Sequence, residues 1–298
     1  MTKNLKKKKP EKKSRRKRKK RNLEQEENLT GRFWPFLVLL IAFIFPHPVS
    51  GQSLEYPFKN GEYARYGAYY NWNFIWVQSG EVEFKADTVK YKQQEAWHLK
   101  AIGRSFKAYD LLYSVRDTFE AYNNYKTFSP IYSSRVMNHA RQNSVHTYGF
   151  DSASGKVEMQ IKQDKKPLYR SVLPCPNNTY DLLATAYNFR KFDFDKLFIG
   201  QKVPYRMLID RQVADLFFRY LGKENVKTRN GKVYRCHKVS VYLLQGDFFP
   251  EGEYMKIWFT DDKNHLPVQV ETEVLMGSVK ALLLEPRMMK YPLTSQIK

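Results

Sequence analysis

Alternation of apolar and polar residues is the dominant pattern along most of this chain. In residues 81–87, for example, Val82 and Phe84 are separated by charged residues. A period of two is typical of a β-strand with one buried face. The same pattern, or a run of apolar and aromatic residues, predicts further strands at 63–70, 74–79, 97–103, 157–162, 202–210, 213–221, 233–243, 254–260, 267–275 and 278–284.

Short turn sequences separate these segments and indicate how they pair. Connections of two to four residues are too short for the crossover that parallel strands need, so a largely antiparallel sheet is expected. The turns carry glycine, asparagine or aspartate, which suit tight turns. They are Asn60-Gly61, Ser154-Gly155, Asn230-Gly231, Asp261-Asp262-Lys263-Asn264 and Met276-Gly277.

One helix is predicted within this mostly β sequence, at residues 179–190. Asn178 or Thr179 is expected to cap it, and Asp181 would lie in its first turn, where a negative charge suits the helix dipole. The preceding loop makes 173–190 a possible joint between two halves of the domain. One apolar stripe follows helical spacing: Tyr180, Leu183, Ala184 and Tyr187.

The N-terminus has the pattern of an export signal. Residues 1–22 contain 14 Lys and Arg residues against Glu11 alone, and residues 33–45 are apolar. A basic stretch, a short apolar run and a small-residue site before Gln52 are typical of a secretory signal peptide. Cleavage after Gly51 is expected, with an uncleaved N-terminal anchor as the alternative. Residues 1–51 would then be the signal and residues 52–298 the exported β-rich domain, located in the periplasm or cell envelope.

The charge of the remaining chain is modest. After residue 51, 36 Lys and Arg residues are balanced by 26 Asp and Glu residues. This excess is smaller than a dedicated nucleic-acid binder shows, so no nucleic-acid partner is expected. Contact with a membrane is expected only through the signal peptide or anchor.

The sequence contains no recognisable catalytic or metal-binding motif. HExxH, CxxC, GxSxG, GxxxxGK[ST] and GxGxxG are all absent, and the histidines do not share a metal-ligand spacing. We therefore expect no cofactor and no metal, while an active site assembled from distant segments stays open. Cys175 and Cys236 could form one disulfide or remain separate thiols.

Two tripeptides have the form of an O-glycosylation acceptor used in some exported Bacteroidetes proteins. They are Asp87-Thr88-Val89 and Asp151-Ser152-Ala153. Three-residue patterns arise easily by chance, so ordinary turns are the simpler interpretation.

The order of features resembles a family of exported Gram-negative proteins known only as a domain of unknown function, number three-one-zero-eight. The resemblance covers almost the whole chain after residue 60. It rests on Gly61-Glu62 with Tyr66, Ser79-Gly80-Glu81-Val82, Leu112-Tyr113-Ser114-Val115-Arg116-Asp117, Tyr180-Asp181 with Phe189-Arg190, Gly252 with Ile257-Trp258-Phe259-Thr260-Asp261-Asp262, and Leu266-Pro267-Val268 with Gly277-Ser278-Val279.

This resemblance implies a curved antiparallel sheet, or half-open β-barrel, similar to the lipoprotein carriers LolA and LolB, with one or two short helices. Such a sheet would hold a lipid or acyl chain on its apolar concave face, and lipids or lipoproteins would be partners. The family itself supplies no binding residues, so the candidate ligand-binding residues come from the alternating pattern: Val82, Phe84, Trp97 and Leu99. The alternative is a structural or interaction module that engages another envelope protein or a surface glycan. Neither function requires catalytic residues.

Overall fold

The alternating segments form one continuous sheet that folds back on itself and is antiparallel except for the pair of its ninth and tenth strands. The computed structural model describes residues 55–72, 75–110, 114–139, 142–243, 252–273 and 278–297. The predicted signal sequence therefore lies outside the described residues. Residues 53–298 form one compact unit, and its hydrophobic clusters consist of residues from Tyr56 onward.

Fifteen strands and one α-helix are found in the described ranges. The strands are β1 (Glu62–Trp72), β2 (Ile75–Tyr91), β3 (Gln94–Ser105), β4 (Val115–Asn124), β5 (Pro130–His139), β6 (Gln142–Asp151), β7 (Lys156–Gln163), β8 (Tyr169–Pro174), β9 (Thr179–Tyr180), β10 (Lys202–Ile209), β11 (Gln212–Lys227), β12 (Val233–Leu243), β13 (Gly252–Thr260), β14 (Pro267–Glu273) and β15 (Ser278–Arg287). The helix is α4 (Leu182–Phe189), and two short 3₁₀ helices are η2 (Lys107–Tyr109) and η3 (Phe194–Lys196).

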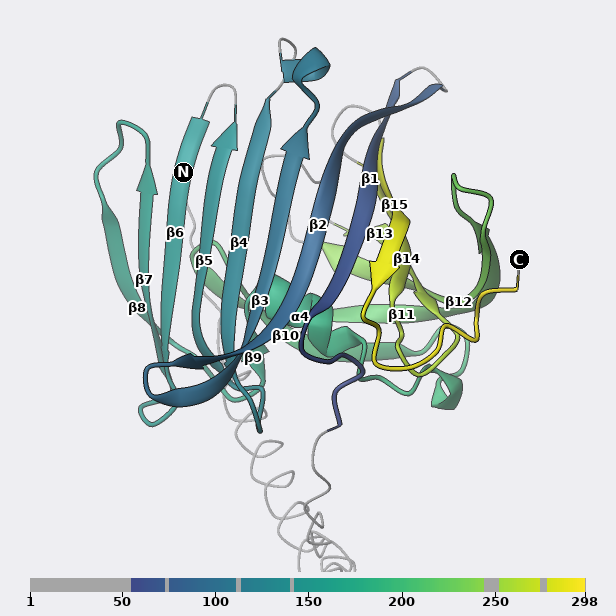
Figure 1. Ribbon diagram of the computed structural model, residues 1–298. Coiled ribbons are helices and arrows are strands. Elements are labelled where there is room, and N and C mark those ends of the chain that lie inside the picture. Colours follow the sequence, from purple (N-terminus) through teal and green to yellow (C-terminus); the bar gives the residue numbers. More distant parts are fainter. Residues whose placement is uncertain are drawn as a thin grey trace, which may run out of the picture. The chain divides into compact units, whose positions relative to one another are not determined.

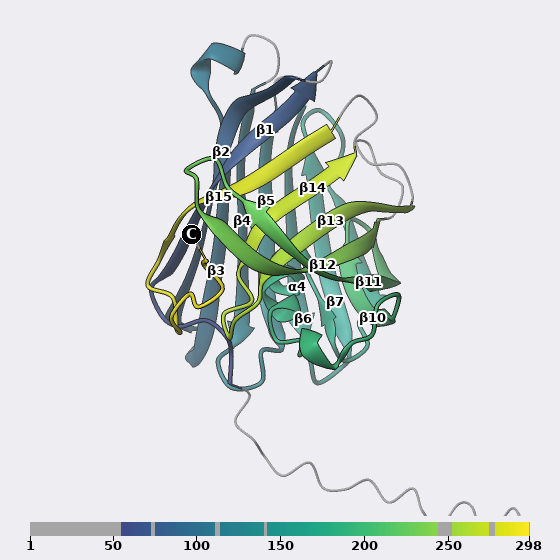
Figure 2. The same ribbon diagram turned by 90° about the vertical axis from the view of Figure 1, so that its right-hand side faces the viewer.

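The strands form a meander in which the first and last strands of the chain, β1 and β15, pair in the middle of the sheet. Strands β1 to β8 follow one another outward, and β10 to β15 return until β15 pairs with β1. The sheet therefore ends in β8 on one side and β9 on the other. It curves strongly, so that β10 to β13 lie behind β2 to β6, with α4 between the two layers (Figures 1 and 2). The mostly β, curved antiparallel fold expected for this chain is confirmed.

Strand β2 is longer than expected from the sequence pattern. The segments 74–79 and 81–87 were expected to be separate strands, but they belong to one strand. The register between β1 and β2 shifts by one residue at this point. Ala68 pairs with Gly80, but the next residue, Tyr69, pairs with Gln78. Ser79 is thus the extra residue of a β-bulge, which bends a strand without ending it. Gly80 lies directly next to this bulge.

Four strands without a clear alternating pattern also join the sheet: β4, β5, β6 and β8. In β5, the inward-facing positions include Ser133 and Arg135, which lie opposite Tyr148 and His146 of β6. Polar residues therefore occupy the inner face as well as the outer face. This mixture removes the simple alternation by which a half-buried strand is recognised.

Side-chain packing brings the outer strands of the two layers together. Strands β7 and β8 contact β10 and β11 through a buried cluster, and the ring of Tyr169 lies 4.2 Å from the guanidinium of Arg211. The buried members of this cluster are Tyr148, Val157, Met159, Ile161 and Leu208. None of the helices in the described ranges has the length and apolar character needed to cross a membrane.

The two tripeptides with the form of a glycosylation acceptor lie in different kinds of structure. Asp87-Thr88-Val89 lies inside β2 and not in a turn. By contrast, Asp151 ends β6 and its carboxylate accepts hydrogen bonds from the backbone of Ala153 and Ser154, as turn residues do. Cys175 and Cys236 are free thiols, and the second is buried.

Candidate functional site

An apolar cavity lies inside the curved sheet, against helix α4. Its volume is about 490 Å³. Val82 and Phe84 of β2 form part of one wall, and Ile257 and Val270 of the returning strands form part of the opposite wall. A volume of this size falls within the usual range of about 300–1,000 Å³ for small-molecule sites.

A second, smaller cavity of about 230 Å³ adjoins the first. The two share lining residues from β2, α4, β13 and β14, so they are neighbouring parts of one interior space. The shared residues are Val82, Phe84, Ala186, Ile257 and Val270.

Small residues opposite Val82 and Phe84 help to leave this space unfilled. Directly opposed residues of an antiparallel pair point to the same face of the sheet. Val82 lies opposite Gly103, and Phe84 lies opposite Ala101. Because neither partner has a long side chain, the inner face of β3 is hollow next to β2.

The four predicted ligand-binding residues share this inner face but have different surroundings. Val82 and Phe84 line the cavity, whereas Trp97 and Leu99 are 4% and 0% exposed and lie in a packed cluster. Trp97 packs edge-on against the ring of Phe58 at 4.9 Å. Residues at this end of the inner face therefore contribute to the core.

Helix α4 separates the packed end from the cavity. The predicted apolar stripe of the helix is buried in the core, with Leu183 and Tyr187 each 5% exposed. The neighbouring face points into the cavity through Leu182 and Ala186. Leu182 is 41% exposed, an unusual state for a leucine on the inner side of a fold, and this exposure shows that the cavity is open to solvent.

Asp181 caps this helix, in place of the expected Asn178 or Thr179. Its carboxylate accepts hydrogen bonds from the backbone amides of Leu183 and Ala184 at 2.9 and 3.2 Å. Thr179 instead belongs to strand β9. Burial raises the pKa of Asp181 to about 6, although these hydrogen bonds act in the opposite direction.

A buried ion pair lies at the floor of the smaller cavity, where Glu62 and Arg190 are 2% and 3% exposed. Both guanidinium Nη atoms of Arg190 donate to the Glu62 carboxylate. Arg190 also donates to the carbonyls of Asn264 and Pro57 at 3.0 and 3.2 Å. An arginine at the end of the predicted helix would be expected to form a surface ion pair, and the burial of this pair corrects that interpretation. The partner is 128 residues away in the sequence, and no local pattern predicts such a pairing.

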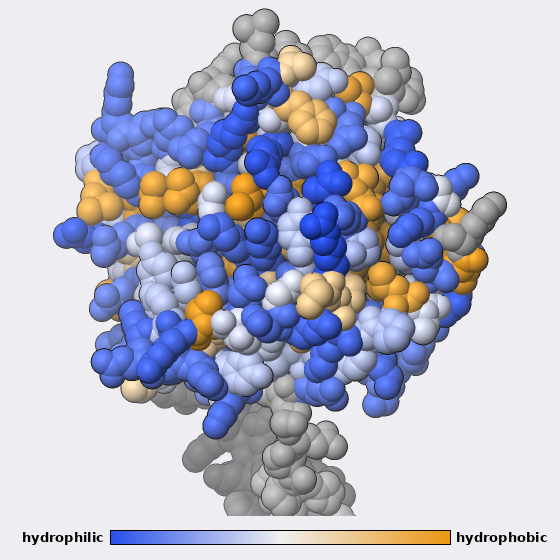
Figure 3. Space-filling view, in the orientation of Figure 1, coloured by the Kyte–Doolittle hydropathy of each residue, from blue (hydrophilic) through white to orange (hydrophobic). Residues whose placement is uncertain are grey.

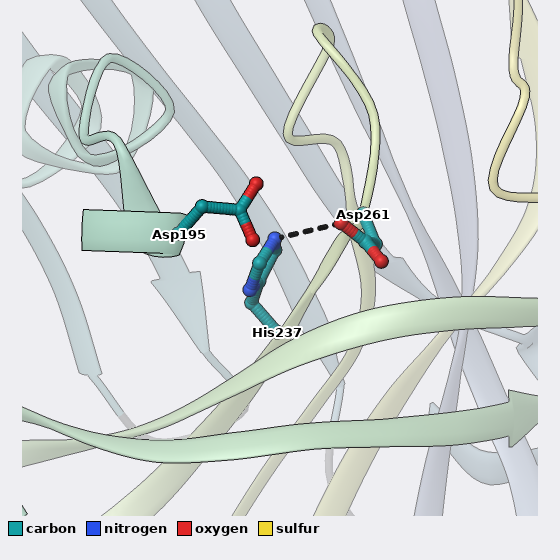
Figure 4. Close-up of side chains that lie close together, drawn as sticks. All are labelled: Asp195, His237 and Asp261. Atoms are coloured by element: carbon teal, nitrogen blue, oxygen red, sulfur yellow. Dashed lines mark ion pairs between the residues drawn. The ribbon is translucent and has the colours of Figure 1, made fainter. Parts of the chain in front are cut away.

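Asp195, His237 and Asp261 form a second cluster of polar residues, in which the ligand atoms lie within 4.8 Å of one another (Figure 4). Nε2 of His237 lies 3.1 Å from Oδ1 of Asp261, although the ring is not aligned for a hydrogen bond to it. Nδ1 of the same ring is 3.1 Å from the hydroxyl of Tyr220. Burial lowers the pKa of His237 below its usual value, so its imidazole is neutral at pH 7.

This cluster has ligand types that a divalent cation accepts, but a lysine already supplies the positive charge. The Lys223 ammonium lies 2.8 Å from Asp195 and 3.2 Å from Asp261. Hydrogen bonding to Asp195 is the main cause that raises the pKa of Lys223, and Arg235 adds a second positive charge 3.6 Å from Asp261. Two carboxylates balanced by two cations leave little net attraction for a metal ion. We interpret the cluster as an ion-pair network.

Comparison with known proteins shows to which family this chain belongs. The family described as "Protein of unknown function (DUF3108)" matches residues 65–284, which is more than half of the chain. The protein belongs to this family. The resemblance identified from the sequence is therefore confirmed, while the likeness to LolA and LolB and export from the cytoplasm stay predictions.

The fold also has a similar solved structure in another family of unknown function. This structure is described as "Crystal Structure of Beta-barrel-like Protein of Domain of Unknown Function DUF1849 from Brucella abortus". The TM-score is 0.50 at 8% sequence identity, and the alignment covers 78% of this chain and 100% of that chain. At this identity the similarity concerns the fold alone. No curated protein matches the chain.

Several residues of the site could not be identified from the sequence. Ala186, Ile257 and Val270 line both cavities. Ile257 and Val270 followed a strand pattern, which predicts one buried face but not whether that face meets side chains or empty space. Ala186 lay outside the predicted apolar stripe. The available signal was the small residues Ala101 and Gly103 on β3 and Ala186 on α4. They lie on two elements that are far apart in the sequence.

Proposed function

We propose that this protein binds a hydrophobic or amphiphilic ligand, such as a lipid or acyl chain, in the cavity between the curved sheet and α4. The observation that supports this most directly is the open apolar cavity against which Leu182 and Ala186 are exposed. Exposed apolar surface inside a fold is costly unless a ligand covers it. The face seen in Figure 3 is by contrast mainly hydrophilic, with smaller apolar groups in between.

The cavity chemistry suits an aliphatic chain better than a polar ligand. Each buried CH₂ group contributes about 0.8 kcal/mol, so a chain inserted over half its length would offset a substantial part of the cost of association. Polar residues lie at the margin, including Asp117, which pairs with His139 at 3.0 Å. They would face the polar end of an amphiphile. The N-terminal signal pattern supports a site of action in the periplasm or cell envelope, where lipids and lipoproteins are the available ligands.

Filling the cavity is the most direct test. Ala186 is exposed within the cavity, so Ala186→Phe can occupy the space without displacing the core. We expect residues 53–298 to bind a fluorescent fatty acid saturably, and Ala186→Phe to weaken that binding at least tenfold. Fluorescence titration would measure the dissociation constants, and circular dichroism would verify the fold.

The matched control is Asn188→Phe, on the same helix. Asn188 lines a different surface depression and not this cavity. The control variant should bind the fatty acid as the parent does. Equal binding by the parent and Ala186→Phe, or no saturable binding by the folded parent, would contradict the proposal.

A second candidate function, glycan binding, is favoured by a cleft at the packed end of the inner face. This cleft has a volume of about 1050 Å³ and includes Tyr125, which is 39% exposed and stacks on Trp97 at 5.4 Å. An exposed aromatic ring next to charged and amide side chains can contact a sugar ring and its hydroxyl groups. Binding of envelope glycans that Tyr125→Ala abolishes and Ala186→Phe leaves intact would favour this alternative.

A further inference from the structure

Two adjacent apolar residues, Phe198 and Ile199, project from the surface between η3 and β10. They are 70% and 73% exposed, the highest values among the large apolar residues described. Scattered exposed apolar residues are common on soluble proteins. Two neighbours exposed to this degree on one turn form a feature that calls for a specific explanation.

The turn that carries them is held by hydrogen bonds. The amide of Gln201 donates to the carbonyl of Phe198 at 3.0 Å, and the side-chain oxygen of Gln201 accepts from the amide of Phe198 at 3.2 Å. Gly200, at φ +91°, donates to the carbonyl of Tyr220 at 2.8 Å. The turn is therefore fastened both internally and to strand β11.

A bulge in β11 supports Ile199 from below. The register of β11 slips between Tyr220 and Gly222, and Gly222 has φ +97°. A Cβ atom at Gly222 would lie 3.1 Å from Cδ1 of Ile199. The base of Ile199 thus rests on a glycine backbone, and its remaining surface faces outward. Because the turn is already ordered, its side chains lose little conformational entropy when they bind.

Basic residues flank the apolar pair on both sides. Lys196 is 82% exposed on its side chain, and Lys202 is also exposed. Asp193 pairs with Lys196, and Asp195 pairs with Lys223. These charges balance in pairs, so Lys202 supplies the positive charge next to the tip. An apolar tip between lysines matches the order of chemistry at a membrane surface, where acyl chains lie below anionic head groups.

We infer that the Phe198-Ile199 turn inserts into the interface of a lipid bilayer that contains anionic phospholipid. A folded protein partner would need a complementary surface much larger than two side chains. A bilayer accommodates a small apolar tip without such complementarity. This surface is separate from the cavity, so the inference goes beyond the proposed ligand binding and does not depend on it.

Vesicle binding by residues 53–298 tests the inference. This segment forms its own compact unit, and it lacks the apolar run at 33–45, which could bind vesicles by itself. With vesicles of phosphatidylcholine and phosphatidylglycerol, we expect cosedimentation of the parent. The double variant Phe198→Ser, Ile199→Ser should bind at least tenfold more weakly while its thermal midpoint stays within about 2 °C, because surface changes of this kind alter stability by only about 0.5 kcal/mol.

Two control variants separate this turn from other features. Met288→Ser removes another exposed apolar side chain, 60% exposed, and should leave vesicle binding unchanged. Ala186→Phe fills the ligand cavity and should also bind vesicles as the parent does. Loss of vesicle binding in Ala186→Phe with retention in the double variant would show that the cavity, and not the turn, contacts lipid.

A direct contact would be visible in a third variant. Phe198→Trp should shift its fluorescence emission to shorter wavelength when vesicles are added, relative to the parent. Vesicle binding that is absent in the folded parent, or equal in the double variant, would overturn the inference. A concentration-dependent dimer that the double variant loses would also overturn it, because a second copy of the chain would then be the partner.

Discussion

Asp181 shows how one buried carboxylate can both order a helix and make stability depend on pH. Its side chain satisfies two amides at the start of α4, which stabilises the helix. Its burial raises the pKa from 3.8 to about 6. Between about pH 4 and pH 6 the unfolded chain has released this proton and the folded chain retains it. The free energy of unfolding contributed by this group therefore falls as the pH rises through that window.

We expect Asp181→Asn to remove this penalty while keeping the cap. Asparagine caps helices about as well as aspartate does. A difference of about two pKa units corresponds to about 3 kcal/mol, so the variant should be more stable than the parent above pH 6, by up to that amount. Urea denaturation at pH 4, 5, 6 and 7 would measure the difference.

The free energies of unfolding of the variant and the parent have to be compared at each pH. His146 also makes this free energy depend on pH, but in the opposite direction to Asp181. Burial lowers the pKa of His146 to about 4, so its contribution to stability falls as the pH drops from about 6.5 to 4. This contribution cancels when Asp181→Asn is compared with the parent. Asp193→Asn, at a carboxylate that is 54% exposed, is the control for the loss of a surface carboxylate. A difference for Asp181→Asn that is constant from pH 4 to 7 would contradict the prediction.

Strand β2 shows at the scale of an element how a bulge permits a strand to bend beside the cavity. Gly80 lies at the bulge and lines the cavity rim with Ser79. A Cβ atom at this position would lie 2.3 Å from the backbone oxygen of Arg104 on β3. Only glycine permits this close approach of the two backbones.

Gly80→Ala is therefore expected to destabilise the domain by about 1–3 kcal/mol, as overpacking does. Gly149→Ala is the matched control, because no atom would lie within 4 Å of its new Cβ and its φ is not positive. That substitution should be neutral or slightly stabilising. Denaturation midpoints of the two variants would test the prediction, and equal midpoints would show that β3 moves away without cost.

At the scale of the whole molecule, Arg190 links segments that are distant in sequence. It joins the end of α4 to β1 through Glu62, to the N-terminal segment through Pro57, and to the turn after β13 through Asn264. Removing one member of a buried pair leaves the other charge without compensation, which typically costs about 3–5 kcal/mol.

We expect Arg190→Leu to cost about that amount, whereas Arg190→Leu combined with Glu62→Leu should cost less than the single change. Arg65→Leu is the control. Arg65 pairs with Glu81 and Glu285 at the surface, with 32% of its side chain exposed, and such pairs contribute about 0–1 kcal/mol. Chemical denaturation of all four proteins would measure the free energies of unfolding. Equal losses for Arg190→Leu and Arg65→Leu would contradict the assigned role.

Local pattern was sufficient for much of the secondary structure. The strand at 233–243 was predicted at its observed bounds, and the one helix was predicted within three residues at its start. Pro267 begins β14, a position that suits proline because it has no N–H group to donate to the sheet. These features depend on neighbouring residues in the chain, through alternation, helical spacing and backbone restriction, so they can be read without knowing the fold.

Tertiary structure decided the pairings and the empty space. The β1–β15 pair joins residues near 65 to residues near 285, and Arg190 finds Glu62 across 128 residues. Val82 and Trp97 have the same alternating pattern, yet one lines a cavity and the other is buried beneath aromatic rings. The sequence determined which residues turn inward, because that depends on local periodicity. Whether an inward side chain meets a partner or a cavity depends on the size of residues brought opposite it by distant strands and by α4, and only the folded sheet sets those neighbours.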